Sequence, residues 1–333
     1  TLLACLRIGI APAMARAAKL FGERLKDPRR VRDAADRLIP DVAGDGVAKA
    51  DVVIEAIFEN VEAKRSLFAA VEKRAKPDAI LATNTSSIPL EEIASALADP
   101  SRLVGLHFFN PVARMMLVEV VVGATTRATL VAPAAAFVRQ IDRLPLPVKS
   151  APGFLVNRVL APYLMAAMRA VDEGIAPETV DEAALAFGMP MGPIELADTV
   201  GLDICVAVGR LLGANAEPPR ELMKRVEAGE LGKKSGRGFY RWESGKPVKA
   251  AAGTPPAGLA ERLVGPYVDE AKAALAQGIV ADADLVDAGA IFGTGFAPFR
   301  GGPIQYVRET GVDVVLARLR ALQATHGDRF APR

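Results

Sequence analysis

The first 150 residues alternate between two patterns of hydrophobic and polar positions. Apolar residues at helical spacing predict helices, and the short, nearly continuous apolar runs between them predict buried strands. The predicted helices and strands follow one another along the chain: helices at 11–26, 61–74 and 89–97, strands at 51–57, 79–83 and 103–108. Strands that are apolar on both faces are typical of a parallel sheet covered by helices on both sides. We therefore expect residues 1–150 to form an α/β domain.

From residue 152 onward the pattern is helical, and part of it occurs twice. The first helices are predicted at 153–172, 179–187 and 193–212. Three motifs recur later in the same order: 158–163 as 262–267, 173–175 as 277–279, and 192–194 as 302–304. Ordered matches of this kind indicate a duplicated helical domain.

These patterns divide the chain into four parts. We predict an α/β domain at 1–150, a first helical domain at 151–243, a linker at 244–257 and a second, degenerate helical copy at 258–333. The linker is rich in Gly, Pro, Ala and Lys, which is typical of connecting segments. The fold class expected is α/β followed by all-α.

The composition excludes several classes of function. The 41 basic and 39 acidic residues are interspersed, so no face for nucleic acid is expected. No uncharged apolar run approaches the length of about 18 residues that a transmembrane helix needs. Two histidines, His107 and His326, are too few for the usual metal-ligand motifs. The two cysteines, Cys5 and Cys205, lie far apart and indicate a reducing compartment, the cytoplasm.

Polar residues follow three of the predicted strands, at the point where each strand ends. They are Glu59-Asn60, the run 84–87 and the run 107–110. In open α/β sheets, ligands bind outside the carboxyl ends of the parallel strands. The three polar ends therefore predict one crevice.

His107 in this crevice has a candidate partner in Glu119. Glu119 interrupts the apolar run 115–122, and a carboxylate buried there needs a partner. A carboxylate that binds one imidazole nitrogen fixes the tautomer, so that the second nitrogen can act as a base. The alternative from the residues alone is a core histidine whose hydrogen bonds are satisfied beside a glutamate at a strand end.

Several motifs occur along the chain in a specific order and spacing. They are Asn84-Thr85-Ser86-Ser87, Gly105-Leu106-His107-Phe108-Phe109-Asn110-Pro111, Glu119, Pro152-Gly153-Phe154-Leu155-Val156-Asn157-Arg158, Gly188-Met189-Pro190-Met191-Gly192-Pro193 and Gly236-Arg237-Gly238-Phe239-Tyr240. Together they resemble the 3-hydroxyacyl-CoA dehydrogenase family over nearly the whole chain. The second helical copy, which contains residues 292–303, is similar to the dehydrogenase half of the multifunctional fatty-acid oxidation α-subunits.

The resemblance implies a reaction and the residues that catalyse it. The substrate would be an (S)-3-hydroxyacyl-CoA, and the product a 3-ketoacyl-CoA, as NAD is reduced. His107 would take the proton of the 3-hydroxyl group as general base, and Glu119 would orient His107 and stabilise its protonated form. Ser86 and Asn157 would bind the substrate oxygen.

The resemblance also implies a cofactor site and partners. Glu59, Lys64, Asn84 and Asn110 match positions that line NAD. An enoyl-CoA hydratase half and a thiolase subunit would accompany the dehydrogenase in the complete protein.

Simpler structural roles remain open for several of these residues. Asn84 and Ser86 can cap the helix that follows the strand. Asn157 can make a packing hydrogen bond on an apolar helix, and Lys64 can lie on a solvated helix face.

One departure from the family concerns the start of the chain. The family opens with a strand and a GxGxxG loop that binds the dinucleotide pyrophosphate, and no GxGxxG occurs in this sequence. Thr1-Leu2 matches the end of the family's second strand, and the acidic ribose partner expected next falls near Ala4. The Rossmann-like sheet is therefore expected to be truncated and the NAD site incomplete. The alternative to an enzyme is a catalytically impaired fragment that serves as a binding or structural remnant.

Overall fold

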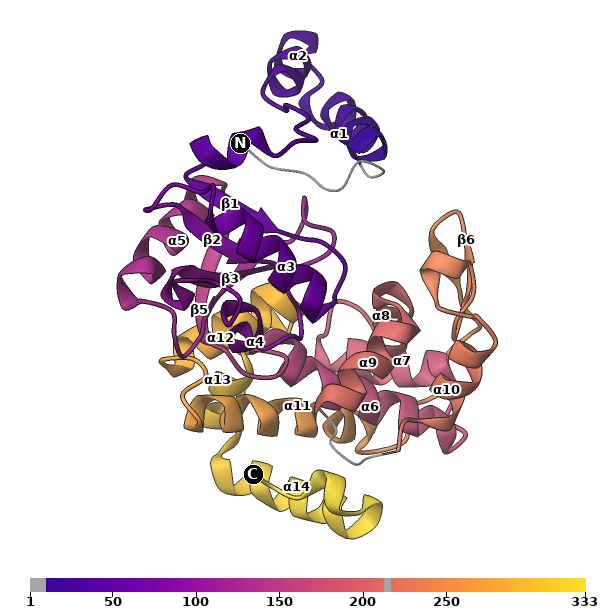
Figure 1. Cartoon of the computed structure of the whole chain (residues 1–333). Helices are drawn as coiled ribbons and strands as arrows, with labels where there is room; N and C mark the ends of the chain where they lie inside the picture. Colours follow the sequence, from indigo (N-terminus) through magenta and orange to yellow (C-terminus); the bar gives the residue numbers. More distant parts are fainter. Residues whose placement is uncertain (1–9, 213–216) are drawn as a thin grey trace. The chain divides into compact units, whose positions relative to one another are not determined.

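The structure is a computed structural model that describes residues 10–212 and 217–333 (Figure 1). The chain divides into two compact units. The first comprises the described residues up to Phe108 together with Val118–Ser150, and the second comprises Phe109–Leu117 and Ala151–Arg333. The expectations for Thr1-Leu2 and for Ala4 lie outside the described residues.

The first unit is built on a five-stranded sheet in the order β1-β2-β3-β4-β5. Its strands are β1 (Val52–Glu55), β2 (Ile80–Thr83), β3 (Leu103–Phe108), β4 (Leu117–Val122) and β5 (Leu144–Lys149). The parallel arrangement predicted for the first three strands is confirmed. β4 instead pairs antiparallel with β3. The connection between them, residues 109–116, is shorter than the dozen or so residues that a parallel crossover needs.

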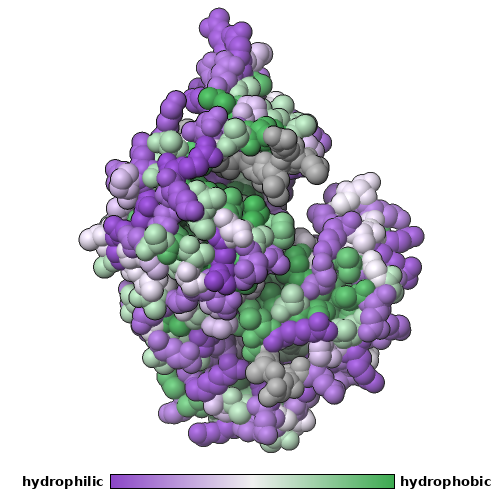
Figure 2. Space-filling model, viewed as in Figure 1, coloured by the Kyte–Doolittle hydropathy of each residue, from purple (hydrophilic) through white to green (hydrophobic). Residues whose placement is uncertain are grey.

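The described part of the first unit also contains five helices. They are α1 (Ile10–Leu25), α2 (Pro28–Asp36), α3 (Val61–Glu72), α4 (Leu90–Ala94) and α5 (Ala128–Gln140), with 3-10 turns at Asp45–Lys49 and Pro100–Arg102. Of these helices, α3, α4 and α5 pack on the sheet. α3 begins where the sequence predicts it, because Asn60 caps it by accepting a hydrogen bond from the Ala63 N–H at 3.0 Å. α2 buries none of its residues, and Figure 2 shows a hydrophilic surface at the top of the view, where α2 lies.

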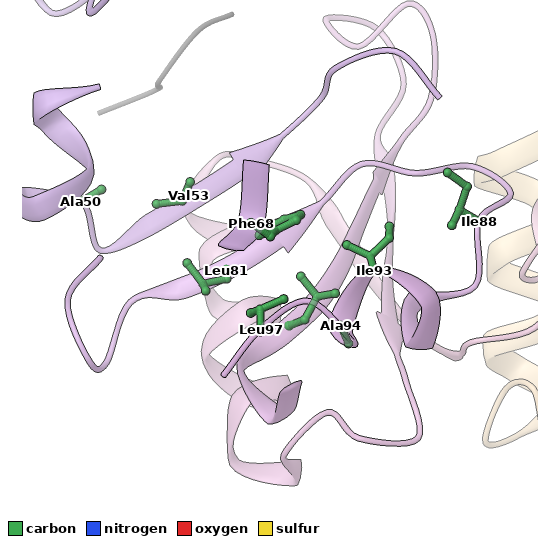
Figure 3. Close-up of a cluster of buried hydrophobic side chains, with 9 residues drawn as sticks. Ala50, Val53, Phe68, Leu81, Ile88, Ile93, Ala94 and Leu97 are labelled. Atoms are coloured by element: carbon green, nitrogen blue, oxygen red, sulfur yellow. The ribbon is translucent and has the colours of Figure 1, made fainter. Parts of the chain in front are cut away.

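The sheet is apolar on both faces. One cluster of buried side chains joins β1 and β2 to α3 and α4, and Phe68 lies at its centre with Leu81 and Ile93 (Figure 3). The other cluster joins alternate strand residues, such as Val104 and Leu106, to α5. Because side chains alternate along β3, His107 lies on the same face of the sheet as Leu103, which packs in the first cluster.

The second unit is helical, as predicted. Its elements are α6 (Val156–Asp172), α7 (Pro177–Phe187), α8 (Pro193–Val200), α9 (Leu202–Leu212), α10 (Arg220–Glu227), α11 (Leu259–Ala276), α12 (Ala283–Thr294), α13 (Pro303–Thr310) and α14 (Val312–His326), with 3-10 turns at Lys233–Ser235, Pro298–Arg300 and Asp328–Phe330, and a hairpin of β6 (Arg241–Glu243) and β7 (Lys246–Val248). α6 and α11, which carry the repeated motif, pack against each other (Figure 1). None of the helices in the described part of the chain could span a membrane.

The sequence repeat corresponds to a repeated local structure. In α7, the Asp181 carboxylate accepts hydrogen bonds from the N–H groups of Ile194 and Glu195 at the start of α8. In α12, Asp287 does the same for the first turn of α13, with bonds of 2.6 and 3.0 Å from Ile304 and Gln305. The first turn of a helix has N–H groups without intrahelical partners, so each aspartate satisfies two of them.

Gly192 and Gly302 allow the two aspartates to approach these helix starts. A Cβ atom at Gly192 would lie 2.1 Å from Cγ of Asp181, and one at Gly302 would lie 2.4 Å from Cβ of Asp287. Only glycine allows this approach, which explains why the Gly-Pro-Ile motif occurs in both copies.

One predicted helix is in fact two. The apolar pattern of residues 193–212 keeps its helical period, but the backbone turns at Gly201, whose φ is +112°. α8 therefore ends at Val200 and α9 begins at Leu202. The hydrophobic pattern could not show the break, because it records which faces are buried and not the path of the backbone between them.

Candidate active site

Polar residues of the predicted site gather at the edge where β1, β2 and β3 end. Asn84 follows β2 directly, and its backbone N–H donates a 2.8 Å hydrogen bond to the carbonyl of Glu55 at the end of β1. Its side-chain Oδ1 accepts a 2.8 Å hydrogen bond from the N–H of Phe108 at the end of β3. Asn84 thus holds three strand ends together.

His107 and Glu119 form the pair predicted from the sequence. They lie directly opposite each other on β3 and β4. Nδ1 of His107 is 2.7 Å from Oε2 of Glu119, and both side chains are buried. The hydrogen-bonding distance expected between His107 and Glu119 is confirmed.

On the same two strands, Gly105 lies opposite Val121. A Cβ atom at Gly105 would lie 2.6 Å from Cβ of Val121.

This geometry defines the chemistry of the pair. An ionised Glu119 carboxylate only accepts hydrogen bonds; beside it, Nδ1 of His107 would carry the proton and Nε2 the lone pair. The imidazole can then take a proton at Nε2, and the positive charge that results faces the Glu119 carboxylate.

Lys64 is fully buried, so it does not lie on a solvated helix face. Its Nζ is 2.8 Å from Oε1 of Glu55 and 3.2 Å from Oε2 of Glu59. A buried ammonium group needs such partners, because leaving it without a counter-charge is very costly.

Glu59 anchors the turn that carries Ser86. Its Oε1 accepts hydrogen bonds from the Thr85 hydroxyl at 2.5 Å, from the Ser86 N–H at 3.0 Å and from both the N–H and the hydroxyl of Ser87 at 3.2 and 3.1 Å. Burial raises the pKa of Glu59, but the Thr85 hydrogen bond and the charge of Lys64 outweigh it and hold the pKa below its ordinary value.

Neither Asn84 nor Ser86 caps the following helix. α4 begins at Leu90, and the residue at its N-cap is Pro89. Asn84 instead bonds to β3, and Ser86 is fixed through its backbone by Glu59. Helix capping therefore does not explain why these two residues lie at the carboxyl edge of the sheet.

The remaining two predicted residues belong to the second unit. Asn157 lies in the first turn of α6 and is half-buried, and Asn110 is exposed in the segment Phe109–Leu117. Their assembly with His107 and Ser86 into one site stays a prediction.

Sequence reasoning missed three residues of this cluster: Glu55, Thr83 and Thr85. Glu55 ends the apolar strand β1 and is buried, as Glu119 is buried in β4. The argument that identified Glu119, a single carboxylate in an apolar strand, applies to Glu55 as well. Thr83 carried no signal, because threonine is common in strands for packing reasons alone. Thr85 stood in the motif 84–87 but was given no role of its own.

The polar groups at this edge fit the nicotinamide end of a dinucleotide. The Ser86 hydroxyl, the Asn84 amide and the partly exposed Glu59 carboxylate offer donors and acceptors to a carboxamide and to ribose hydroxyls. Donors for the pyrophosphate would come from a GxGxxG loop, which the sequence lacks. The expectation of an incomplete NAD site therefore stays a prediction. Among the described residues, no three His, Cys, Asp or Glu side chains form a group that could hold a metal ion.

Comparison with known proteins identifies the family. Residues 5–151 match the 3-hydroxyacyl-CoA dehydrogenase, NAD binding domain, and residues 153–242 match the 3-hydroxyacyl-CoA dehydrogenase, C-terminal domain. The chain belongs to the 3-hydroxyacyl-CoA dehydrogenase family. Its first unit therefore contains the family's NAD-binding domain, as the sequence motifs indicated.

Solved dehydrogenase structures agree with this assignment. A 3-hydroxybutyryl-CoA dehydrogenase from Escherichia coli K12 matches 100% of this chain and 91% of its own, with a TM-score of 0.87 and 27% identity. The (S)-3-hydroxybutyryl-CoA dehydrogenase PaaH1 from Ralstonia eutropha is 34% identical over 72% of this chain and 87% of its own, with a TM-score of 0.65.

Curated relatives of greater length match as well. The fatty acid oxidation complex subunit alpha of Shewanella sp. (strain ANA-3) is 35% identical over 97% of this chain. That of Vibrio cholerae is 39% identical over 86% of this chain. The chain spans about half the length of the Shewanella relative, 49% of it. The matched half carries the dehydrogenase domains, as predicted.

Proposed function

We propose that this chain oxidises (S)-3-hydroxyacyl-CoA to 3-ketoacyl-CoA with reduction of NAD, as a step of fatty-acid oxidation. The observation that carries the proposal is the buried His107–Glu119 pair, at 2.7 Å, near the carboxyl edge of an NAD-binding sheet. A base with a fixed tautomer is what the oxidation of a secondary alcohol needs, because the hydroxyl proton must leave as the carbonyl forms.

In the mechanism, Nε2 of His107 takes the proton of the 3-hydroxyl group. The electron pair of that O–H bond forms the carbonyl, and the hydride of the C3–H bond leaves. NAD, when bound, supplies the acceptor for this hydride. Glu119 stabilises the imidazolium that results, and Ser86 and Asn157 bind the substrate oxygen as its charge develops.

We assign the cofactor end of the site to Glu59, Lys64, Asn84 and Asn110. Asn84 and Glu59 are supported by their positions at the strand ends, and Lys64 by its contact with Glu59. Glu59 and Lys64 act by holding the turn at 85–87 in place as much as by contact with the nicotinamide ribose.

We further propose that the protein acts in the cytoplasm, with an enoyl-CoA hydratase half and a thiolase subunit as partners. The support is the likeness to subunits named for a fatty acid oxidation complex. The alternative, a non-catalytic remnant, has less support, because the base, its carboxylate and the turn that carries Ser86 are all assembled.

The test compares variants of the two histidines in the full-length protein. His107→Gln should lower kcat for NADH formation from (S)-3-hydroxybutyryl-CoA by about 10²–10⁴-fold, the usual contribution of a general base. His326→Gln, in α14, is the matched control and should leave kcat unchanged. A wild-type protein that forms no NADH, or a His107→Gln variant with normal kcat, would contradict the proposal.

A further inference from the structure

Glu55 is a buried carboxylate in the cluster at the carboxyl edge. Its side chain is about 1% exposed. Its Oε1 accepts hydrogen bonds from Lys64 Nζ at 2.8 Å and from the Ile57 N–H at 2.6 Å, and its Oε2 accepts one from the Thr83 hydroxyl at 2.7 Å. Strand β2, helix α3 and the connection after β1 therefore each donate to this carboxylate.

Glu59 is held differently. Its side chain is 36% exposed and lies in the connection between β1 and α3. Its Oε2 faces Lys64, and its Oε1 takes all the hydrogen bonds from the turn 85–87. The position of that turn thus depends on Glu59, and Glu59 depends on Lys64.

Lys64 connects the two carboxylates. Its ammonium group lies between the carboxylates of Glu55 and Glu59. Because Lys64 is fully buried, water cannot take the place of either carboxylate. Without Glu55, the ammonium would lose its closest counter-charge and keep only Glu59 and the Ile57 carbonyl at 3.5 Å, so it would move toward Glu59 or toward solvent. Either movement would change how Glu59 meets the turn.

We propose that Glu55 is a positioning residue: it sets the place of Ser86 through the chain of contacts Glu55–Lys64–Glu59. The inference rests on the proposed function for its kinetic consequence, since Ser86 is there assigned to the substrate oxygen. The contact chain itself can be tested without that assignment, through the backbone of the turn.

The first measurement is hydrogen exchange at the amides of Ser86 and Ser87, which donate to Glu59. Glu55→Gln keeps the shape of the side chain and removes its charge. It should speed exchange at both amides by about tenfold, equivalent to about 1.4 kcal/mol, because the turn loses part of what holds Glu59 in place. Unchanged protection of these amides would overturn the proposal, whether or not the protein is an active dehydrogenase.

Glu72 offers a matched control at the other end of α3. It is also a largely buried carboxylate, and it accepts hydrogen bonds from the Ala98 and Asp99 N–H groups. Glu72→Gln should lower stability without faster exchange at Ser86 or a change in kcat. If Glu72→Gln speeds exchange at Ser86 as much as Glu55→Gln, the effect is general loosening of the unit and the proposal fails.

The second measurement is a double-mutant cycle with Ser86→Ala in the full-length protein. Glu55→Gln alone should lower kcat by about tenfold, with a smaller change in KM. In the Ser86→Ala background the same change should cost less than about twofold, because the residue that Glu55 positions is already gone. An equal loss in both backgrounds would show that Glu55 does not act through Ser86. A wild-type protein without activity would refute the proposed function and leave the exchange result to decide this inference.

Discussion

Glu55 and Glu119 are both buried carboxylates that need a partner, and the two partners differ in kind. Each is a buried carboxylate in an otherwise apolar strand, and each has a partner within 3 Å. Glu119 faces an imidazole, which can exchange a proton, and Glu55 faces an ammonium, which serves to hold geometry. The burial rule predicts that a partner exists, but only the identity of the partner shows whether the pair is suited to chemistry.

The charge of Glu119 is expected to act on the rate rather than on binding. Glu119→Gln keeps a hydrogen-bond acceptor for His107 and removes the charge that stabilises the imidazolium in the transition state. We expect kcat to fall by about 10²-fold or more, with KM changed only a few fold. Glu119→Asp, which keeps the charge and shortens the side chain, should retain more activity than Glu119→Gln. Normal turnover of Glu119→Gln at saturating substrate would refute this role.

Glu59 gives the first unit a dependence on pH. Its pKa is held below the ordinary value of 4.5 in the folded protein. A carboxylate of this kind stabilises the fold above its unfolded pKa, and the contribution is lost as the pH falls through the folded pKa. We therefore expect wild type to be more stable than Glu59→Gln near neutral pH, and the difference to shrink below about pH 4.5. Urea unfolding of both proteins across this range is the measurement, and a difference independent of pH would contradict the assignment.

Hydrophobic periodicity in the sequence predicted the positions of most of the helices and strands for which it gave a prediction. The predictions agree with the structure within a few residues for β2 and β3, for the start of α3 at Val61 and for the end of α6 at Asp172. The antiparallel direction of β4 was not predicted, because an apolar strand has the same pattern in either direction.

β5 was missed for a different reason. It contains Pro145 and Pro147, which cannot donate to a neighbouring strand and argue against a central position. The sheet order resolves this, because β5 lies at its end. The hairpin of β6 and β7 was missed because its strands are short and mostly exposed, and lie in a stretch rich in glycine and charge.

The two capping aspartates allow the repeated elements to be compared quantitatively. Asp181 accepts hydrogen bonds from the Tyr240 hydroxyl and Lys249 Nζ, both at 2.8 Å, in addition to those from the first turn of α8. Among the described residues, Asp287 accepts hydrogen bonds from the first turn of α13 alone. Asp181→Ala should therefore cost at least about 3 kcal/mol of unfolding free energy, and Asp287→Ala about 1–3 kcal/mol. Urea unfolding measures both. Equal losses would show that the contacts of Asp181 with Tyr240 and Lys249 add nothing.

The second of the two units that make up the molecule contains its own core. Tyr163 of α6 and Tyr267 of α11 meet edge to face with ring centroids 6.2 Å apart, and Phe296 packs against both Tyr267 and Phe187 at 5.2 and 5.8 Å. These buried rings come from both helical copies, so each copy supplies part of the surface that covers the other. Repeated units that cannot bury their apolar faces alone are stable when they pack on one another.

This arrangement predicts that residues 151–333 fold without the first unit. The fragment keeps α6 to α14 and both capping aspartates, and loses only the short segment Phe109–Leu117 from the second unit. We expect helical circular dichroism, a single cooperative thermal transition and no binding of NADH, because the NAD-binding domain is absent. The matched control is residues 151–257, which lacks the second copy and exposes the α6 face that packs on α11. If that shorter fragment unfolds as cooperatively and at the same temperature as residues 151–333, the two copies are independent and the shared core does not stabilise the unit.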